Sequence, residues 1–157
     1  SGDGGGTGSS DRRTLKTDEP VVSNDTWHHI VCVFTDESNA NWKIYVDGVE
    51  KDASTSGTGG ANVYKDPADA PAFLGKRFTT AAKYFTGKLD ECALWDTALN
   101  GAAILQIYNS GTPTNLTINT KNYQSKSSLK GYWRNGDAIG TATYPTINDL
   151  SKTSGHS

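Results

Sequence analysis

The sequence predicts an all-β fold, an antiparallel β-sandwich with one short helix. Apolar residues make up only 34% of the chain and 17 of its 157 residues are Gly, a balance typical of sheets joined by many turns. The run "WHHIVCVF" (27–34) is compact, β-branched and aromatic, and is the best strand candidate. "WKIYVDGVEKDA" (42–53) predicts a hairpin, because Asp47-Gly48 suits a two-residue turn with positive φ at both positions.

The N-terminal part of the chain divides into an arm and the first strands. Residues 1–20 are expected to be a flexible or loop-like arm, since they begin Gly- and Ser-rich. "RRTLKTDEPVV" (12–22) offers a weak strand that ends at Pro20. The nearly continuous apolarity of residues 27–34 predicts a strand covered on both faces. Asp47 is assigned a structural role in the hairpin turn.

The second half of the chain contains further strand candidates and one helix. A short strand is expected around Val63 in a long loop of small residues, followed by strands in "AFLGKRF" (72–78) and "KYFTGKLDECALW" (83–95). Gly87 marks a bend or bulge in the latter. Helical spacing appears in "DTALNGAAILQIYNSG" (96–111).

In the predicted helix, Ile104, Ile107 and Tyr108 share one face. Asn100 is placed to cap its start and Gly111 to end it. After Pro113, "LKGYWRNGDAIGTATYPTINDLS" (129–151) adds one more aromatic strand and a loop.

Charge and composition exclude several classes of function. A formal net charge of −2 gives no reason to expect nucleic-acid binding, and no apolar stretch is long enough to span a membrane. The sequence contains no Met and no secretory signal, so we expect a processed product, a fragment or part of a longer chain. Cys32 and Cys92 each lie in an apolar run and are interpreted as small buried hydrophobes, with a disulfide as the alternative.

No catalytic set is visible in the sequence. His28 and His29 are neighbours on one strand and point to opposite faces, so they cannot reach the same ion, and we assign them to the strand framework. Asp90 and Glu91 are likewise adjacent and diverge. The sequence shows no Gly-x-Ser-x-Gly elbow, and its "GDGGGTG" run lacks the Lys-Ser/Thr of a phosphate-binding loop. The chain is therefore predicted not to be an enzyme.

Four segments in a characteristic order resemble a known family. "TWHHIVCVF", "WKIYVDGVEK", "AFLGKR" and "YFTGKLDECALWDTALNGAAILQIYNSG" look like the second half of a laminin G-like domain, covering about residues 25–111. Such domains belong to the concanavalin A-like jelly-roll superfamily, which includes the pentraxins, so the resemblance implies a jelly-roll sandwich. Hydrolases of this superfamily carry Glu-x-Asp-x-Glu on one strand, and this sequence has no such run.

The C-terminal segment departs from the order that this family shows. "LKGYWRNGD" with "TINDLS" resembles the opening strand of the same kind of domain, although it lies near the end of the chain. We therefore divide the chain into the arm 1–20, a laminin G-like sandwich over 21–112 and a C-terminal extension over 113–157. The extension completes the sandwich, begins another copy or reaches a neighbouring subunit.

The resemblance also implies binding sites. In similar domains a carboxylate placed like Asp90 joins backbone carbonyls around calcium, and Asp149 lies in a matching C-terminal loop pattern. Sugar recognition uses aromatic faces with planar polar groups. Four candidates flank the loops: Trp42, Tyr64, Arg77 and Tyr84.

The predicted function is a non-enzymatic binding module for glycans or a cell-surface partner, helped by calcium. It would be located outside the cell, on a cell surface or on a virion surface. The alternative is a structural or assembly subunit whose partners are neighbouring copies or other virion and surface proteins, since similar arrangements occur in large surface and phage virion proteins. Neither hypothesis involves nucleic acid or membrane insertion.

Overall fold

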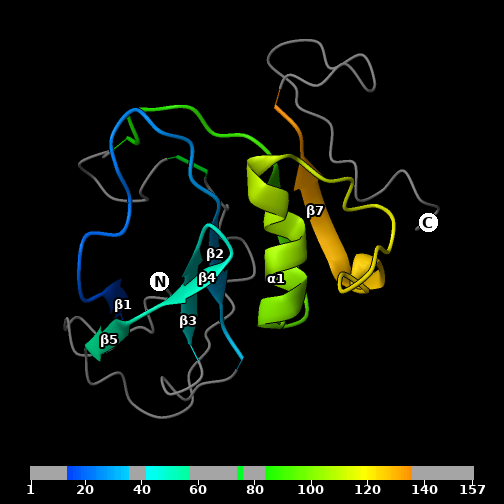
Figure 1. Cartoon of the computed structure of the whole chain (residues 1–157), viewed down its shortest axis with the longest axis horizontal. Helices are drawn as coiled ribbons and strands as arrows, with labels where there is room; N and C mark the ends of the chain where they lie inside the picture. The colour runs from blue at the N-terminus through cyan, green and yellow to red at the C-terminus, as the bar shows by residue number, and fades with distance from the viewer. Residues whose placement is uncertain (1–13, 36–41, 57–73, 76–83, 136–157) are drawn as a thin grey trace, which may run out of the picture.

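The chain is mostly β with one short helix. The structure, a computed structural model, describes residues 14–35, 42–56, 74–75 and 84–135. These residues form three small antiparallel sheets, with strand orders β1-β5, β2-β3-β4 and β6-β7, and helix α1 (Gly101–Tyr108). In Figure 1, α1 stands between the β2-β3-β4 sheet and strand β7.

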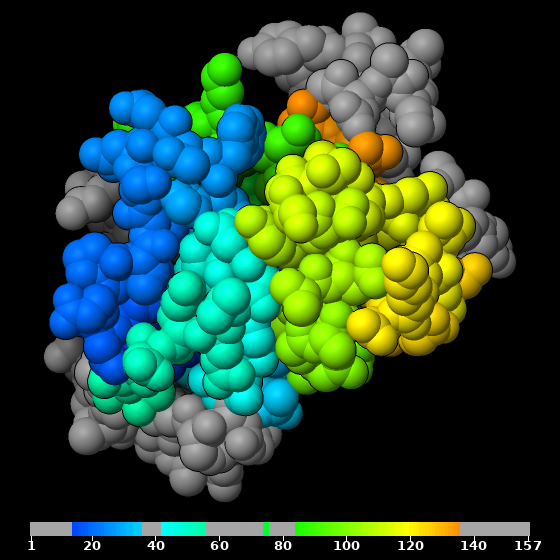
Figure 2. Space-filling model, in the orientation of Figure 1, coloured from blue at the N-terminus to red at the C-terminus, as the bar shows by residue number. Residues whose placement is uncertain are grey.

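The three-stranded sheet is built around the predicted hairpin. Strands β3 (Lys43–Val46) and β4 (Val49–Lys51) are joined at Asp47 and Gly48, whose φ angles of 53° and 77° confirm the predicted turn. Strand β2 (Ile30–Val33) pairs antiparallel with β3, with Val33 opposite Lys43. The β3-β4 hairpin lies against α1 (Figure 2), and a Cβ added at Gly48 would come within 2.8 Å of Leu105 Cδ1.

The expected N-terminal arm needs a correction. Residues Thr14–Thr17 form strand β1, which pairs antiparallel with β5 (Ala53–Ser56), so this part of 1–20 is not loop-like. The weak strand predicted before Pro20 is thereby confirmed. The pairing satisfies backbone groups that a free arm would leave to water. The division into 1–20, 21–112 and 113–157 is otherwise still a prediction.

The third sheet joins the end of the sandwich segment to the extension. Strand β6 (Cys92–Trp95) pairs with β7 (Leu129–Trp133) of the same chain, with a register shift between Leu94 and Trp95. The aromatic C-terminal strand is thus confirmed, as is the bend at Gly87. Strand β6 is shorter than the predicted segment, and Tyr84 makes only a single bridge.

Helix α1 begins as predicted and ends earlier than predicted. Asn100 Oδ1 accepts a hydrogen bond of 2.8 Å from the N–H of Ala103, which satisfies one of the free donors of the first turn. The C-cap is Asn109, in the left-handed conformation at φ 43°, rather than Gly111. Gly111 instead closes the 3-10 turn Asn109–Gly111 that follows. Asn tolerates left-handed backbone better than most residues, so it replaces Gly here.

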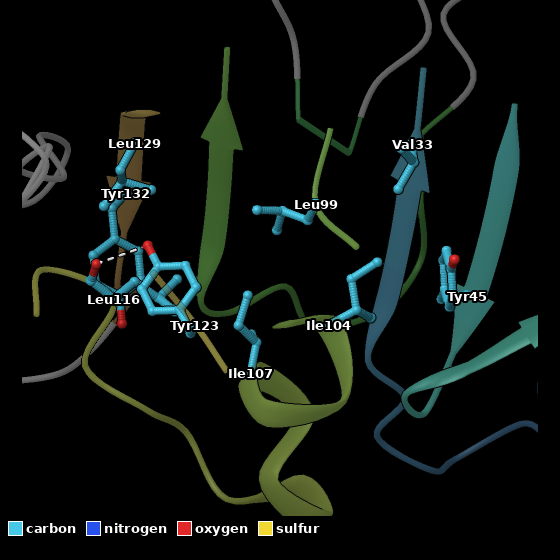
Figure 3. Packing of buried hydrophobic residues seen from close by; sticks show 9 residues of the cluster. All are labelled: Val33, Tyr45, Leu99, Ile104, Ile107, Leu116, Tyr123, Leu129 and Tyr132. Carbon is cyan, nitrogen blue, oxygen red and sulfur yellow. Dashed lines mark hydrogen bonds between the residues drawn. The ribbon is translucent and has the colours of Figure 1, made fainter. Parts of the chain in front are cut away.

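One hydrophobic core joins α1 to both neighbouring sheets (Figure 3). Ile104 and Ile107 of α1 lie between Val33 and Tyr45 of the three-stranded sheet and Tyr132 of β7. The remaining buried members of the cluster are Leu99, Leu116, Tyr123 and Leu129. Four of the nine buried residues of the cluster therefore follow residue 107 in the sequence, and the helix packs between the β2-β3-β4 sheet and β7.

The prediction that β2 is covered on both faces was wrong. Val33 points into the core and is 5% exposed, but Ile30 and Phe34 on the other face are 57% and 52% exposed. Apolar composition alone does not show which face of a strand meets a partner. The strand predicted around Val63 and most of 72–78 lie outside the described residues.

Candidate binding site

A broad open hollow lies between strands β2 and β6. Its volume is about 1560 Å³, and it extends from the Trp27–Thr35 segment to the connection that follows α1. The exposed apolar side chains of Ile30, Phe34 and Leu94 line it, together with the polar side chains of Asp47 and Glu91. Small-molecule pockets usually measure about 300–1,000 Å³, so this hollow suits an extended ligand better than a compact one.

Asp90 lies two residues before β6 and faces Asn135, two residues after β7. Its Oδ1 accepts hydrogen bonds from the N–H of Glu91 at 2.8 Å and of Asn135 at 2.9 Å. Asn135 Nδ2 donates to the carbonyl of Leu89 at 2.9 Å. The fold thus brings a predicted ligand residue together with Asn135, which the sequence analysis did not single out. The only sequence signal was the resemblance of "GYWRNGD" to an opening strand.

Glu91 anchors the strand pair beside Asp90. Its Oε1 accepts from Arg134 Nε at 2.7 Å and its Oε2 accepts from the hydroxyl of Tyr132. Burial, followed by the hydrogen bond to Glu91, raises the pKa of Tyr132 above its ordinary value, so the hydroxyl remains a donor. The Glu91 carboxylate is therefore occupied by structural contacts.

Asp90 and Asn135 provide oxygen atoms of the kind that calcium prefers. Asn135 Oδ1 is buried and has no hydrogen-bond partner in the described part of the chain, whereas Asp90 Oδ1 already accepts two N–H groups. The described residues contain no group of three or more His, Cys, Asp and Glu side chains that could hold a metal. Asp149 lies outside them. The pair fits a calcium site only as part of a larger oxygen set.

Two of the four predicted sugar-contacting residues can be placed. Trp42 precedes β3, is half-buried and meets Phe34 edge-on, with ring centroids 5.0 Å apart. Tyr84 is 69% exposed beside Phe85, which is 58% exposed. Tyr64 and Arg77 lie outside the described residues. Tyr84 and Phe85 thus offer an exposed aromatic surface, whereas Trp42 is already packed on a neighbour.

His28 and His29 belong to the framework, as the sequence predicted. His28 Nδ1 lies 2.8 Å from Asp47 Oδ2, and the N–H of His29 donates to Asp47 Oδ1 at 3.0 Å. The ring of His29 stacks on Tyr108 of α1 with centroids 6.0 Å apart. Burial raises the pKa of the Asp47 carboxyl, but the hydrogen bonds from His28 and His29 outweigh it and hold that pKa below its ordinary value. Asp47 therefore fastens the hairpin turn to the chain before β2.

Ser23, His28 and Asp47 follow one another in the hydrogen-bonding order of a serine-hydrolase triad. Ser23 Oγ lies 3.0 Å from His28 Nε2. The N–H of Ser23 also donates to that Nε2, at 3.1 Å. The lone pair that a general base would offer to the hydroxyl is thus already shared with a backbone donor. We interpret the three residues as a structural hydrogen-bond cluster that holds the hairpin turn against the segment before β2.

We expect Asp47→Ala to lower the free energy of unfolding by about 2–3 kcal/mol, because it leaves two donors without their charged acceptor. Alanine at φ 53° adds backbone strain to this loss. Urea unfolding followed by tryptophan fluorescence measures the change. Asp52→Ala, at an exposed position just after β4, is the matched control and should change stability little. Equal losses of unfolding free energy in the two variants would contradict this structural role of Asp47.

The two cysteines are free thiols. Cys32 is partly exposed and Cys92 is half-buried, so neither is the fully buried hydrophobe that the sequence predicted. Partial burial raises the pKa of both thiols, which disfavours the reactive thiolate.

The β-rich architecture, the Asp-Gly hairpin and the short helix after β6 together define the class of this chain. Residues 3–105 match the laminin G-like family of the concanavalin A-like lectin/glucanase superfamily. The chain belongs to this family, which implies a jelly-roll β-sandwich. The match ends inside α1, so β7 and the connection leading to it lie beyond it.

One curated relative is the "Sushi, von Willebrand factor type A, EGF and pentraxin domain-containing protein 1" of Rattus norvegicus. It is 29% identical over 100 residues, which are 60% of this chain and 3% of the rat protein. The chain thus resembles one small part of a large multidomain protein. No solved structure matches the chain. In the described part of the chain, no helix is long and apolar enough to cross a membrane.

Proposed function

We propose that this chain is a non-enzymatic binding module that recognises a glycan on an extracellular or cell-surface partner. The observation that carries the proposal is the open hollow between β2 and β6 in a chain of the lectin/glucanase superfamily. Its size suits an extended ligand such as an oligosaccharide. The exposed ring of Tyr84 adds an aromatic surface of the kind that packs on sugar rings.

A binding role agrees better with the carboxylates than a hydrolytic one. A retaining glycosidase needs a free acid and a free nucleophile about 5 Å apart. Glu91 is instead bonded to Arg134 and Tyr132, and Asp90 Oδ1 accepts two backbone N–H groups. Both side chains therefore hold the β6-β7 pair in place.

Calcium would act at Asp90 and Asn135. These residues connect the segment before β6 with the end of β7, so a bound cation would stiffen this end of the sheet next to the hollow. The role of calcium is therefore expected to be positional: it orders the loop that a ligand contacts.

The test is a glycan-array screen of the purified chain, run with calcium and with a chelator. We expect binding that falls at least about tenfold in the chelator, and a similar loss in Asp90→Asn, which keeps an acceptor oxygen but removes the charge. Asp52→Asn is the control, because Asp52 is an exposed carboxylate just after β4 and does not line the hollow. Binding unaffected by chelator would remove the calcium role. Absence of binding in both conditions, or release of new reducing ends from a bound glycan, would overturn the proposal.

The second candidate function is a structural or assembly subunit. One observation favours it. The core includes four side chains from residues 114–135, and this segment follows a turn in which Ser110 has a left-handed φ of 56°. A glycan-array result without binding would leave assembly as the better interpretation, and light scattering would then measure it directly.

A further inference from the structure

The segment that completes the core is connected to the rest of the chain by one exposed turn. Residues 114–135 contribute four buried side chains to the core: Leu116, Tyr123, Leu129 and Tyr132. The segment is internally bonded, because Tyr132 OH contacts the carbonyl of Thr114 at 3.1 Å and Tyr123 OH donates to that of Leu116 at 2.9 Å. It therefore packs onto the molecule as a unit.

The turn that precedes this unit is held in an unusual backbone conformation. Asn109, Ser110 and Gly111 have successive φ values of 43°, 56° and 82°, all in the left-handed region. Glycine adopts such angles freely and asparagine tolerates them, but serine is strained there. All five residues from Asn109 to Pro113 are exposed, so the turn can extend without uncovering core side chains. Extension would relieve the strain at Ser110.

The contacts that hold the unit in place all join it to the other part of the chain. Strand β7 pairs with β6, Trp95 Nε1 donates to Tyr123 OH at 3.1 Å, and Arg134 Nε donates to Glu91 at 2.7 Å. Every copy of the chain carries both partners of each contact. The same contacts can therefore form between two copies with a twofold axis, without new surface chemistry.

We propose that this chain forms a domain-swapped dimer. Two copies exchange residues 114–135, and the turn Asn109–Pro113 acts as the hinge. In the resulting dimer, β7 of each copy pairs with β6 of the other, and each turn is extended and free of left-handed strain. The closed monomer and the exchanged dimer share their core, so strain in the turn and chain concentration set the balance between them. The turn also borders the hollow of the proposed glycan site, but the exchange is tested without any glycan, so failure of either proposal can be recognised separately.

The register of the β6-β7 pair provides a direct test. Cys92 lies opposite Trp133, so Trp133→Cys places two thiols on neighbouring antiparallel strands. With Cys32→Ser as background throughout, one chain keeps Cys92 and carries no further change, and the other carries Trp133→Cys with Cys92→Ser. The two are mixed, unfolded in urea, refolded together at increasing concentration and oxidised. A disulfide between position 92 of one chain and position 133 of the other reports exchange if it forms after joint refolding but not when the two chains are refolded separately, then mixed and oxidised.

We expect a mixed disulfide, identified by peptide mass, whose yield rises with concentration. A single chain that carries both Cys92 and Trp133→Cys is the control, because its internal disulfide shows that the pair can be oxidised. Adding Ser110→Gly to the mixed pair removes the strain from the closed form and should lower the dimerisation constant by about tenfold or more. The native chain should show the same concentration dependence by light scattering.

Failure to form the mixed disulfide, under conditions in which the control chain oxidises fully, would overturn the exchange. If Ser110→Gly left the fraction of dimer unchanged, strain in the turn would not be the cause of dimerisation. If the substitutions prevent folding, a native chain that remains monomeric at the highest soluble concentration, after the same refolding, would equally overturn the proposal.

Discussion

Tyr132→Ala is expected to be the most destabilising single substitution in the described part of the chain, lowering the free energy of unfolding by about 3–5 kcal/mol. Tyr132 is 0% exposed and lies at the centre of the cluster that joins β7 to α1. The substitution removes an aromatic ring from a close-packed core and also leaves Glu91 without its hydroxyl donor. Urea unfolding, monitored by tryptophan fluorescence, measures the loss.

Two further variants separate the causes of that loss. Tyr132→Phe keeps the ring and removes only the hydroxyl, so it should cost about 1–3 kcal/mol. Lys130→Ala lies on the same strand, and the Lys130–Asp96 pair it breaks is about half exposed, so it should cost under about 1 kcal/mol. If Tyr132→Ala cost no more than Lys130→Ala, β7 could not be part of the folded core.

Ile104→Ala is the second large effect that we expect, about 2–5 kcal/mol. Ile104 is 0% exposed and lies where α1 meets the β2-β3-β4 sheet. Because the core around α1 joins the β2-β3-β4 sheet to β7, a cavity at this position weakens the packing between these two sheets rather than one edge of the molecule. Thermal unfolding by circular dichroism should show a clear fall in the midpoint.

Leu105→Ala is the matched control for Ile104→Ala. It introduces alanine one position further along the same helix, in place of a side chain that is 55% exposed. Its effect should be clearly smaller, about 1 kcal/mol, because Leu105 lies outside the buried core although its Cδ1 packs on Gly48. Similar midpoints for the two variants would contradict the role assigned to α1 as the element that joins the sheets.

Local features of this fold were readable from short stretches of sequence. The Asp47-Gly48 turn was predicted because its two residues meet a backbone requirement that few others meet. The start of α1 was predicted because Asn100 caps its own helix three residues away. The family resemblance was likewise carried by short segments in order, and it is confirmed by the match over residues 3–105.

The candidate site was only partly predictable. Asp90 was identified through the resemblance, but its neighbour Asn135 is 45 residues away along the chain. No local pattern links two such positions, since their contact exists only because β7 pairs with β6. The same long-range pairing engages Glu91 with Arg134 and Tyr132, which no inspection of "DECALW" reveals.

By itself, the sequence determined the fold class, the hairpin, the helix and the family of this protein, because each depends on propensities and spacings within a few residues. Only the tertiary structure decided which face of β2 is covered, where the C-terminal strand pairs, and how the strained turn at Ser110 connects two interdependent parts of the core. These features depend on contacts between residues far apart in the chain. Local composition cannot specify them, because burial and pairing arise only when distant segments pack together.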